Sequence, residues 1–211
     1  MCRLLAIKSK CKFSVQPYLI SFAEMCKESK EFQGHGWGCS VLTDFGWKVY
    51  KNIKPIWEDE IPEFGPVTQL LAHARSAFRD EGIIVENNMP FNDAKYQFIF
   101  NGELQGVTIK ESGRIGAEKI FNYLKRFDKG NTKFAIKKGV DVINKKTRYI
   151  RAMNIIISDA ENLYVNNMFN EDPDYFNLTI HQKADFTAVC SQKLNIIDEW
   201  TLLPNNTIKV I

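Results

Sequence analysis

The sequence predicts a layered α+β fold, because its segments run in three blocks: strands with a hairpin, then two helices, then strands again. A wound parallel sheet would instead alternate strands and helices throughout. The 211 residues are 45% hydrophobic and 25% charged, which is typical of a globular protein with a full core. Because we find no internal repeat and no linker-like segment, residues 1–211 are expected to form a single domain.

The N-terminal block predicts strands around one helix. Pro17 begins a stretch in which apolar residues recur at helical spacing, so a helix is expected over 17–31. The turn Asp44-Phe45-Gly46 joins two short apolar segments and is typical of a β-hairpin. Another strand is expected to end on Asn101-Gly102. The predicted strands of this block are residues 2–8, 39–42, 47–50, 70–74 and 98–100.

The remaining segments complete the pattern. Apolar residues at helical spacing predict two helices, over 117–127 and 134–143. The last third returns to strand character, and the predicted strands are residues 153–157, 163–168, 176–180, 186–190 and 207–211.

Cysteine and histidine usage argues against a disulfide scaffold and against a bound metal. The five cysteines are odd in number and form no CxxC pair, and the three histidines show no HxxxH spacing. We therefore expect no metal and no cofactor. No apolar run reaches the roughly 18 residues of a membrane span, and the N-terminus lacks the pattern of a signal peptide, so a cytoplasmic protein is expected.

Positive charge gathers in one stretch. Residues 125–151 contain ten Lys or Arg against two Asp, within a chain whose formal net charge is +3. Such a stretch could meet nucleic acid or an acidic partner. We favour the simpler interpretation, a solvated helix face.

Cys2 follows the initiator methionine directly. Removal of Met1 would place a free α-amine, with a pKa of about 7.7–8.0, beside a thiol with a pKa of about 8.5. A terminal amine can serve as the base for its own nucleophile. The alternative is a buried cysteine that packs as a small hydrophobic residue.

Two further polar positions follow predicted strands. Arg75 comes directly after the strand at 70–74, and its planar guanidinium suits a substrate carboxylate, although a surface salt bridge would also explain it. Asn101-Gly102 is typical of a hairpin turn. The same pair could form an oxyanion hole from the Asn101 side-chain amide and the Gly102 backbone N–H.

A glycine-rich stretch, Gly34-His35-Gly36-Trp37-Gly38, precedes a predicted strand and does not match the GxGxxG phosphate motif. It is interpreted as a turn that brings backbone close to a substrate. Trp37 would line a pocket or fill the core.

Taken together and in order, these motifs resemble the class II glutamine amidotransferases, which are N-terminal nucleophile hydrolases. The chain looks most like the compact stand-alone branch that begins MCRLL. The matching segments are Met1-Cys2-Arg3-Leu4-Leu5-Ala6, His35-Gly36-Trp37-Gly38, Leu71-Ala72-His73-Ala74-Arg75, Asn87-Asn88-Met89-Pro90-Phe91, Asn101-Gly102-Glu103-Leu104 and Ser158-Asp159.

The resemblance implies a four-layer αββα sandwich of two antiparallel sheets. It also implies Cys2 as nucleophile, Arg75 as the clamp on the glutamine α-carboxylate, and Asn101 with Gly102 as the oxyanion hole. The substrate-binding candidates are Arg75, His35, Trp37, His73 and Glu118. The implied reaction hydrolyses glutamine or a γ-glutamyl amide through a thioester, and any ammonia-accepting synthase is expected to be a separate partner.

Four positions depart from the family pattern. Phe100 and Met89 stand where the family usually has histidine, and Ser76 stands where relatives often carry an aromatic residue. Gly116 stands where an aspartate usually holds the substrate's α-amino group, which leaves Glu118 as the nearest acidic residue. An ammonium buried without a carboxylate partner is costly, so free glutamine is expected to bind weakly. The alternative hypothesis is a non-catalytic module that keeps the fold to bind a ligand or partner.

Overall fold

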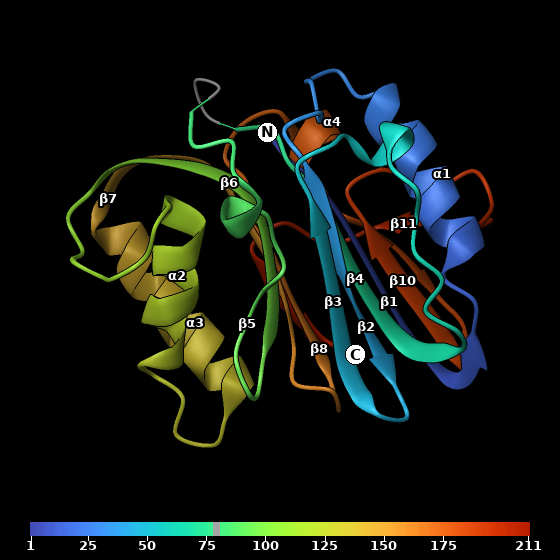
Figure 1. The fold of residues 1–211 in the computed structure, drawn as a ribbon. Coiled ribbons are helices and arrows are strands. Elements are labelled where there is room, and N and C mark those ends of the chain that lie inside the picture. The colour runs from blue at the N-terminus through green and yellow to red at the C-terminus, as the bar shows by residue number, and fades with distance from the viewer. Residues whose placement is uncertain (78–80) are drawn as a thin grey trace.

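The computed structural model describes residues 1–77 and 81–211. Within these residues the strands form two antiparallel sheets that pack face to face, with helix α1 outside one sheet and helices α2 and α3 outside the other (Figure 1). This four-layer αββα arrangement confirms the fold class expected from the sequence.

The larger sheet has seven strands in the described part of the chain, in the order β11-β9-β10-β1-β4-β2-β3. Its strands are β1 (Arg3–Phe13), β2 (Trp37–Thr43), β3 (Gly46–Asn52), β4 (Val67–Ala74), β9 (Thr179–Gln182), β10 (Phe186–Cys190) and β11 (Thr201–Leu202). The N-terminal strand lies at its centre, between β10 and β4, and pairs Arg3 with Ala74. This register brings the chain's first residues beside the end of β4.

The smaller sheet has five described strands in the order β12-β8-β7-β6-β5. They are β5 (Phe91–Asn92), β6 (Gln97–Val107), β7 (Thr147–Ser158), β8 (Leu163–Asn167) and β12 (Thr207–Val210). The helices are α1 (Gln16–Lys27), α2 (Gly116–Lys125), α3 (Thr132–Lys145) and the short α4 (Pro173–Phe176), and single 3₁₀ turns form at Ile56–Glu58 and Val85–Asn87.

Side-chain alternation along β1 divides its residues between two cores. Leu4 and Ala6 pack between the sheets, whereas Leu5 and Ile7 pack toward α1. All four side chains are fully buried, as expected of a central strand covered on both faces. By the same alternation Cys2 belongs to the face that looks toward the smaller sheet.

The structure corrects three expected boundaries. The strand expected to end at Asn101-Gly102 continues to Val107, because Asn101 and Gly102 pair with Asn154 and Met153 of β7 rather than turning. Gly102 is required there, since a Cβ would lie 2.2 Å from the carbonyl oxygen of Ala152.

The other two corrections concern a helix end and a strand start. Helix α1 ends at Lys27 rather than at residue 31. The backbone amide of Glu28 closes its last turn, and the Ser29 hydroxyl just beyond accepts a hydrogen bond from Arg3. Phe176 belongs to α4 rather than to a strand at 176–180, and β9 begins only at Thr179. The ring of Phe176 is fully buried against Ala152 and Tyr175, and this packing holds α4 in place.

Candidate active site

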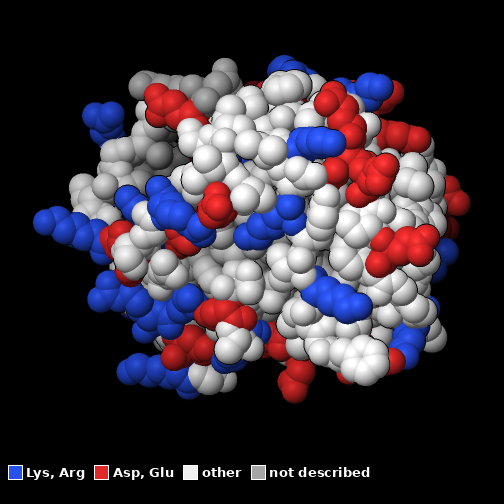
Figure 2. Space-filling model, in the orientation of Figure 1, with Lys and Arg blue, Asp and Glu red and all other residues white. Residues whose placement is uncertain are grey.

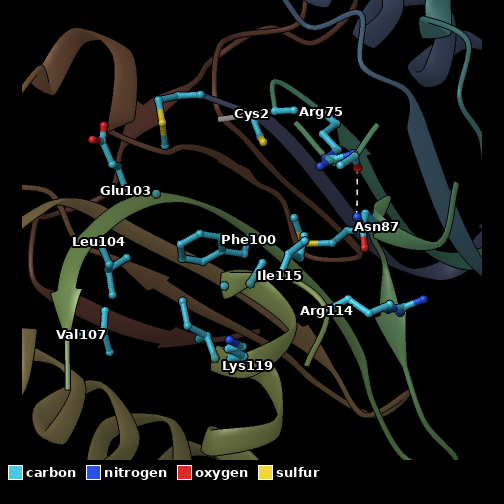
Figure 3. Close-up of a pocket in the computed structure, with 18 of the residues that line it drawn as sticks. Cys2, Arg75, Asn87, Phe100, Glu103, Leu104, Val107, Arg114, Ile115 and Lys119 are labelled. Carbon is cyan, nitrogen blue, oxygen red and sulfur yellow. Dashed lines mark hydrogen bonds between the residues drawn. The ribbon is translucent and has the colours of Figure 1, made fainter. Parts of the chain in front are cut away.

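A cavity of about 990 Å³ lies where β1, β4 and β6 meet the first turn of α2. Cys2 and Arg75 lie together at one end of it, and Leu104 and Val107 of β6 lie toward the other (Figure 3). Phe100 projects between these ends. The structure thus brings distant segments of the chain together around one cavity, which is polar at the end with Cys2 and Arg75 and apolar at the end with Leu104 and Val107.

Cys2 is fixed by the end of β4. Its Sγ lies 3.5 Å from the Ser76 amide nitrogen, which donates to it, and 3.7 Å from the Ser76 carbonyl oxygen. Burial raises the pKa of the Cys2 thiol above its ordinary value, and the amino terminus, the Ser76 amide and Arg75 oppose part of this rise. The thiol is therefore protonated at neutral pH, so attack on a carbonyl requires a base.

Met1 occupies a set of polar contacts next to Cys2. Its carbonyl oxygen accepts hydrogen bonds from Gln33 Nε2 and Tyr175 Oη, each across 2.6 Å, and its amino group contacts Glu31. Arg151 lies 3.5 Å from Glu31, so the contacts of Met1 continue through Glu31 to a side chain nearer the surface. The sequence analysis missed these residues because they come from unrelated segments with no shared local pattern.

Arg75 lines the cavity and is only 5% exposed. Its Nη1 donates to the Gly82 carbonyl oxygen across 2.9 Å, and its Nη2 donates to that of Glu81 across 3.4 Å. A guanidinium carries five N–H donors, so these contacts fix its plane and leave donors for an anionic ligand. This rigid cation near a thiol can hold a carboxylate in a fixed place.

The Asn101-Gly102 pair lies in the middle of β6 and not in a hairpin turn. Phe98 of this strand stacks on Phe121 of α2 with centroids 5.0 Å apart, so by alternation Asn101 faces the larger sheet. Gly102 lines the cavity. Asn101 is fully buried, and neither polar atom of its side chain has a hydrogen-bond partner among the described residues.

Such an unpaired buried amide costs stability, about 1–3 kcal/mol per unsatisfied group. A transition-state oxyanion is a ligand that could use its N–H donor. Of this pair only Gly102 lines the cavity, while Asn101 is buried behind the cavity wall, and the oxyanion-hole role of both residues stays a prediction.

His73 is a buried structural neighbour of this region rather than a cavity residue. Its side chain is fully buried. Burial, followed by the charge of Arg75, lowers the pKa of His73 to about 3, and a backbone interaction with Phe100 opposes part of this fall. The imidazole is therefore neutral at physiological pH.

His35 and Trp37 lie outside the cavity lining. The Nδ1 of His35 accepts a hydrogen bond from the Ala77 amide across 2.8 Å, and its own amide donates to the Arg75 carbonyl oxygen across 3.1 Å. His35 thus holds the segment that follows β4. Trp37 is fully buried on the α1 side, and its Nε1 donates to Asp59 across 2.8 Å.

Glu118 and Gly116 lie on different faces of α2. Glu118 pairs with Arg114, with 2.7 Å between Oε1 and Nη2, and lines a separate small hollow with Lys51. Gly116 lines the main cavity, and a Cβ there would meet no atom within 4 Å. The structure therefore does not bring Glu118 to the thiol and leaves open space at Gly116. Met89 and Phe100 also line the cavity, as apolar wall.

The basic stretch 125–151 is interrupted by carboxylates. Figure 2 shows Lys and Arg side chains over the α2 and α3 side of the molecule with acidic side chains among them. Lys125 pairs with Asp93, and Lys137 pairs with Asp141 at 3.0 Å. Mixed charge of this kind is typical of a solvated helix face.

Comparison with solved structures shows the same fold. The chain resembles a glutamine aminotransferase class-II domain protein from Silicibacter pomeroyi, with a TM-score of 0.66, 14% identity, and coverage of 100% of this chain and 94% of that one. It resembles a predicted glutamine amidotransferase from Pseudomonas aeruginosa with a TM-score of 0.58, 16% identity, and coverage of 99% and 96%.

A third neighbour is the glutamine phosphoribosylpyrophosphate amidotransferase from B. subtilis, with a TM-score of 0.60 and 18% identity. The match covers 90% of this chain but only 42% of that enzyme. No family model and no curated protein sequence matches the chain. The resemblance to class II glutamine amidotransferases is thus confirmed at the level of the fold.

Two features are absent from the described residues, a membrane-spanning helix and a metal-binding cluster. No helix among them has the length and apolar character that crossing a bilayer requires. No cluster of three or more His, Cys, Asp or Glu side chains in the same residues is placed to hold a metal ion.

Proposed function

We propose that the protein is an amidohydrolase of the glutamine amidotransferase type, which hydrolyses glutamine or a γ-glutamyl amide through Cys2. The observation that carries this proposal is the meeting of Cys2, Arg75 and Gly102 at one cavity, with the unpaired Asn101 amide behind it. The fold alone accounts for Gly102, where a Cβ would clash with the Ala152 carbonyl oxygen, but it requires neither the thiol of Cys2 nor the guanidinium of Arg75 at the cavity. The proposed activity begins once Met1 has been removed.

In the proposed reaction the α-amine of Cys2 takes the thiol proton, and Sγ attacks the carboxamide carbon. Asn101 Nδ2 and the Gly102 amide stabilise the oxyanion. The protonated amine then delivers its proton to the leaving nitrogen, the C–N bond breaks and ammonia departs. Water attacks the resulting thioester, the S–C bond breaks, and the products are a carboxylate and the restored thiol.

Arg75 would hold the substrate's α-carboxylate by paired hydrogen bonds. The Gly82 and Glu81 carbonyls fix its plane before binding, so little side-chain entropy remains to be lost. Ammonia would pass to an acceptor on a separate protein, for which the 125–151 face is a candidate docking surface.

Glutamate release by purified protein with proven Met1 removal tests the proposal. We expect release that is lost in Cys2→Ala and kept in Cys11→Ala, because Cys11 is exposed and lies outside the cavity lining. Release that is equal in both variants, or absent for every γ-glutamyl amide tried, would instead support a non-catalytic binding module.

A further inference from the structure

The cavity is much larger than a glutamine side chain requires, and one wall is apolar. It measures about 990 Å³, near the upper end of the 300–1,000 Å³ typical of pockets for drug-sized ligands. The apolar wall comes from the end of β6, the segment after it and α2, and consists of Leu104, Val107, Ile109, Ile115, Ile120 and Tyr123. Figure 3 shows Leu104 and Val107 on the far side of Phe100 from Cys2.

The described cavity wall offers little to hold a substrate ammonium. Glu103 lies 3.6 Å from Arg151, and Glu111 lies 3.3 Å from Arg126, so both carboxylates already have a cation. Glu81 is solvent-exposed, where an ion pair contributes little.

Glu31, the remaining acidic residue of the wall, lies 3.5 Å from Arg151, and this ion pair does not depend on Met1.

Positive charge gathers on the α2 side instead. Gly116 and Ala117 of the first turn line the cavity, and the N-terminus of a helix carries partial positive charge. Lys119, one turn further along the same helix, also lines it. An α-ammonium placed here would be both unpaired and repelled.

A neutral hydrogen-bond acceptor lies beside Arg75. The Nδ2 of Asn87 and the Nη1 of Arg75 donate to the same Gly82 carbonyl oxygen, each across 2.9 Å. This contact fixes the Asn87 amide orientation and leaves its Oδ1 buried with no partner in the described chain. Asn87 is 4% exposed and lines the cavity. A neutral oxygen suits the N–H of an amide, whereas it compensates an ammonium only in part.

On the basis of the proposed function, we infer that the substrate is an N-acylated amino-acid amide: a γ-carboxamide with a free α-carboxylate, and an apolar acyl chain on its α-nitrogen. Arg75 binds the carboxylate, and Asn87 Oδ1 accepts the hydrogen of the acylated nitrogen. The acyl chain lies along Leu104, Val107 and α2. Hydrolysis is the reaction given above and releases ammonia and the N-acylated glutamate.

The test compares kcat/KM for glutamine and for its N-acetyl, N-hexanoyl and N-decanoyl derivatives, using protein without Met1. Burial of each methylene predicts about a fourfold gain, and hexanoyl has four more methylenes than acetyl, so N-hexanoyl-glutamine should exceed N-acetyl-glutamine by roughly 250-fold. Free glutamine should be the poorest substrate. Hydrolysis of glutamine as fast as N-hexanoyl-glutamine overturns the inference while leaving the proposed function intact. If none of the four substrates is hydrolysed and a thiol-reactive diazoketone analogue of glutamine leaves Cys2 unmodified, the proposed function itself is contradicted.

Two substitutions test where the acyl chain of the substrate lies in the cavity. Val107→Asp should abolish the gain with chain length, because it places a charge on the apolar wall. Val210→Asp is its matched control, since Val107 and Val210 are 43% and 39% exposed and Val210 lies on β12 away from the cavity. Gly116→Asp should raise kcat/KM for glutamine and lower it for the acylated forms. An unchanged chain-length dependence in Val107→Asp contradicts the placement, as does faster cleavage of γ-glutamyl-hexylamide than of N-hexanoyl-glutamine.

Discussion

The amide nitrogen of Ser76 lies 3.5 Å from the sulfur of Cys2 and donates a hydrogen bond to it. This contact joins the start of β1 to the residue that follows Arg75, and the register between Arg3 and Ala74 leads to it. The sheet therefore sets the separation of thiol and guanidinium before any substrate binds. Such preorganisation is needed if the guanidinium is to bind the substrate carboxylate while the thiol attacks the amide.

Arg75→Lys should weaken substrate binding more than turnover. A lysine keeps the charge but loses the paired N–H geometry for a carboxylate. We expect KM to rise by about 10- to 100-fold, within the range for losing a hydrogen bond to a charged group. Steady-state kinetics on a γ-carboxamide substrate measure this, with Lys48→Arg, on β3 outside the cavity, as the matched control. A variant with unchanged KM would remove Arg75 from the binding site.

Asn101→Leu should separate catalysis from stability. Loss of an oxyanion donor is expected to lower kcat by about 10²–10³. Because the Asn101 amide is buried and unpaired, an apolar side chain of similar shape should leave the free energy of unfolding equal or higher. Kinetics and urea denaturation test the two halves. A large loss of stability with kcat unchanged would show that the amide serves the fold alone.

His73 should destabilise the protein in acid. Its pKa is about 3 in the folded protein and about 6.5 when unfolded, so the unfolded chain binds the proton first. Its contribution is complete above about pH 6.5 and is lost as pH falls toward 3, at up to about 1.4 kcal/mol per unit. Denaturation of wild type and His73→Gln across this range measures the difference in slope. Identical slopes would contradict the prediction.

The Cys2 thiol should titrate above the ordinary cysteine pKa of about 8.5 in the chain that carries Met1, because burial outweighs the favourable charges around it. The pH dependence of its alkylation by iodoacetamide, followed by peptide mass spectrometry, gives the midpoint. We expect a midpoint above that of the exposed Cys11 and a further rise in Arg75→Gln, which removes a stabilising cation. A midpoint below that of Cys11 would show that the thiol is less buried than described.

The sequence was sufficient for the longer elements and their order, but it missed the short strands β5 and β11 and the helix α4, and it was less reliable for the ends of elements. Periodicity identified the longer strands of both sheets because alternation and apolar runs depend on neighbours along the chain. The prediction that a strand ends at Asn101-Gly102 was wrong, because the local preference of this pair for a turn is outweighed by its pairing with β7. Phe176 likewise looked like strand, but its burial against Ala152 comes from tertiary packing.

The candidate site shows the same division. Cys2, Arg75 and Gly102 were named from short motifs, and the structure places all three at one cavity. Trp37 and Glu118 came from the same reasoning and lie elsewhere, because a motif does not say which face a side chain takes. Asn87 was matched only as part of a motif. Its unpaired oxygen depends on sharing the Gly82 carbonyl with Arg75, which no spacing rule encodes.

The central claim is that a Cys2 with a free α-amine is the nucleophile in this cavity. Treatment of the purified protein with a thiol-reactive diazoketone analogue of glutamine, followed by intact-mass and peptide mass spectrometry, tests it most directly. We predict a chain without Met1 that carries a single adduct on Cys2, and no adduct in Cys2→Ala. Retention of Met1 with an unmodified Cys2, or labelling of Cys11 to the same extent, would contradict the claim.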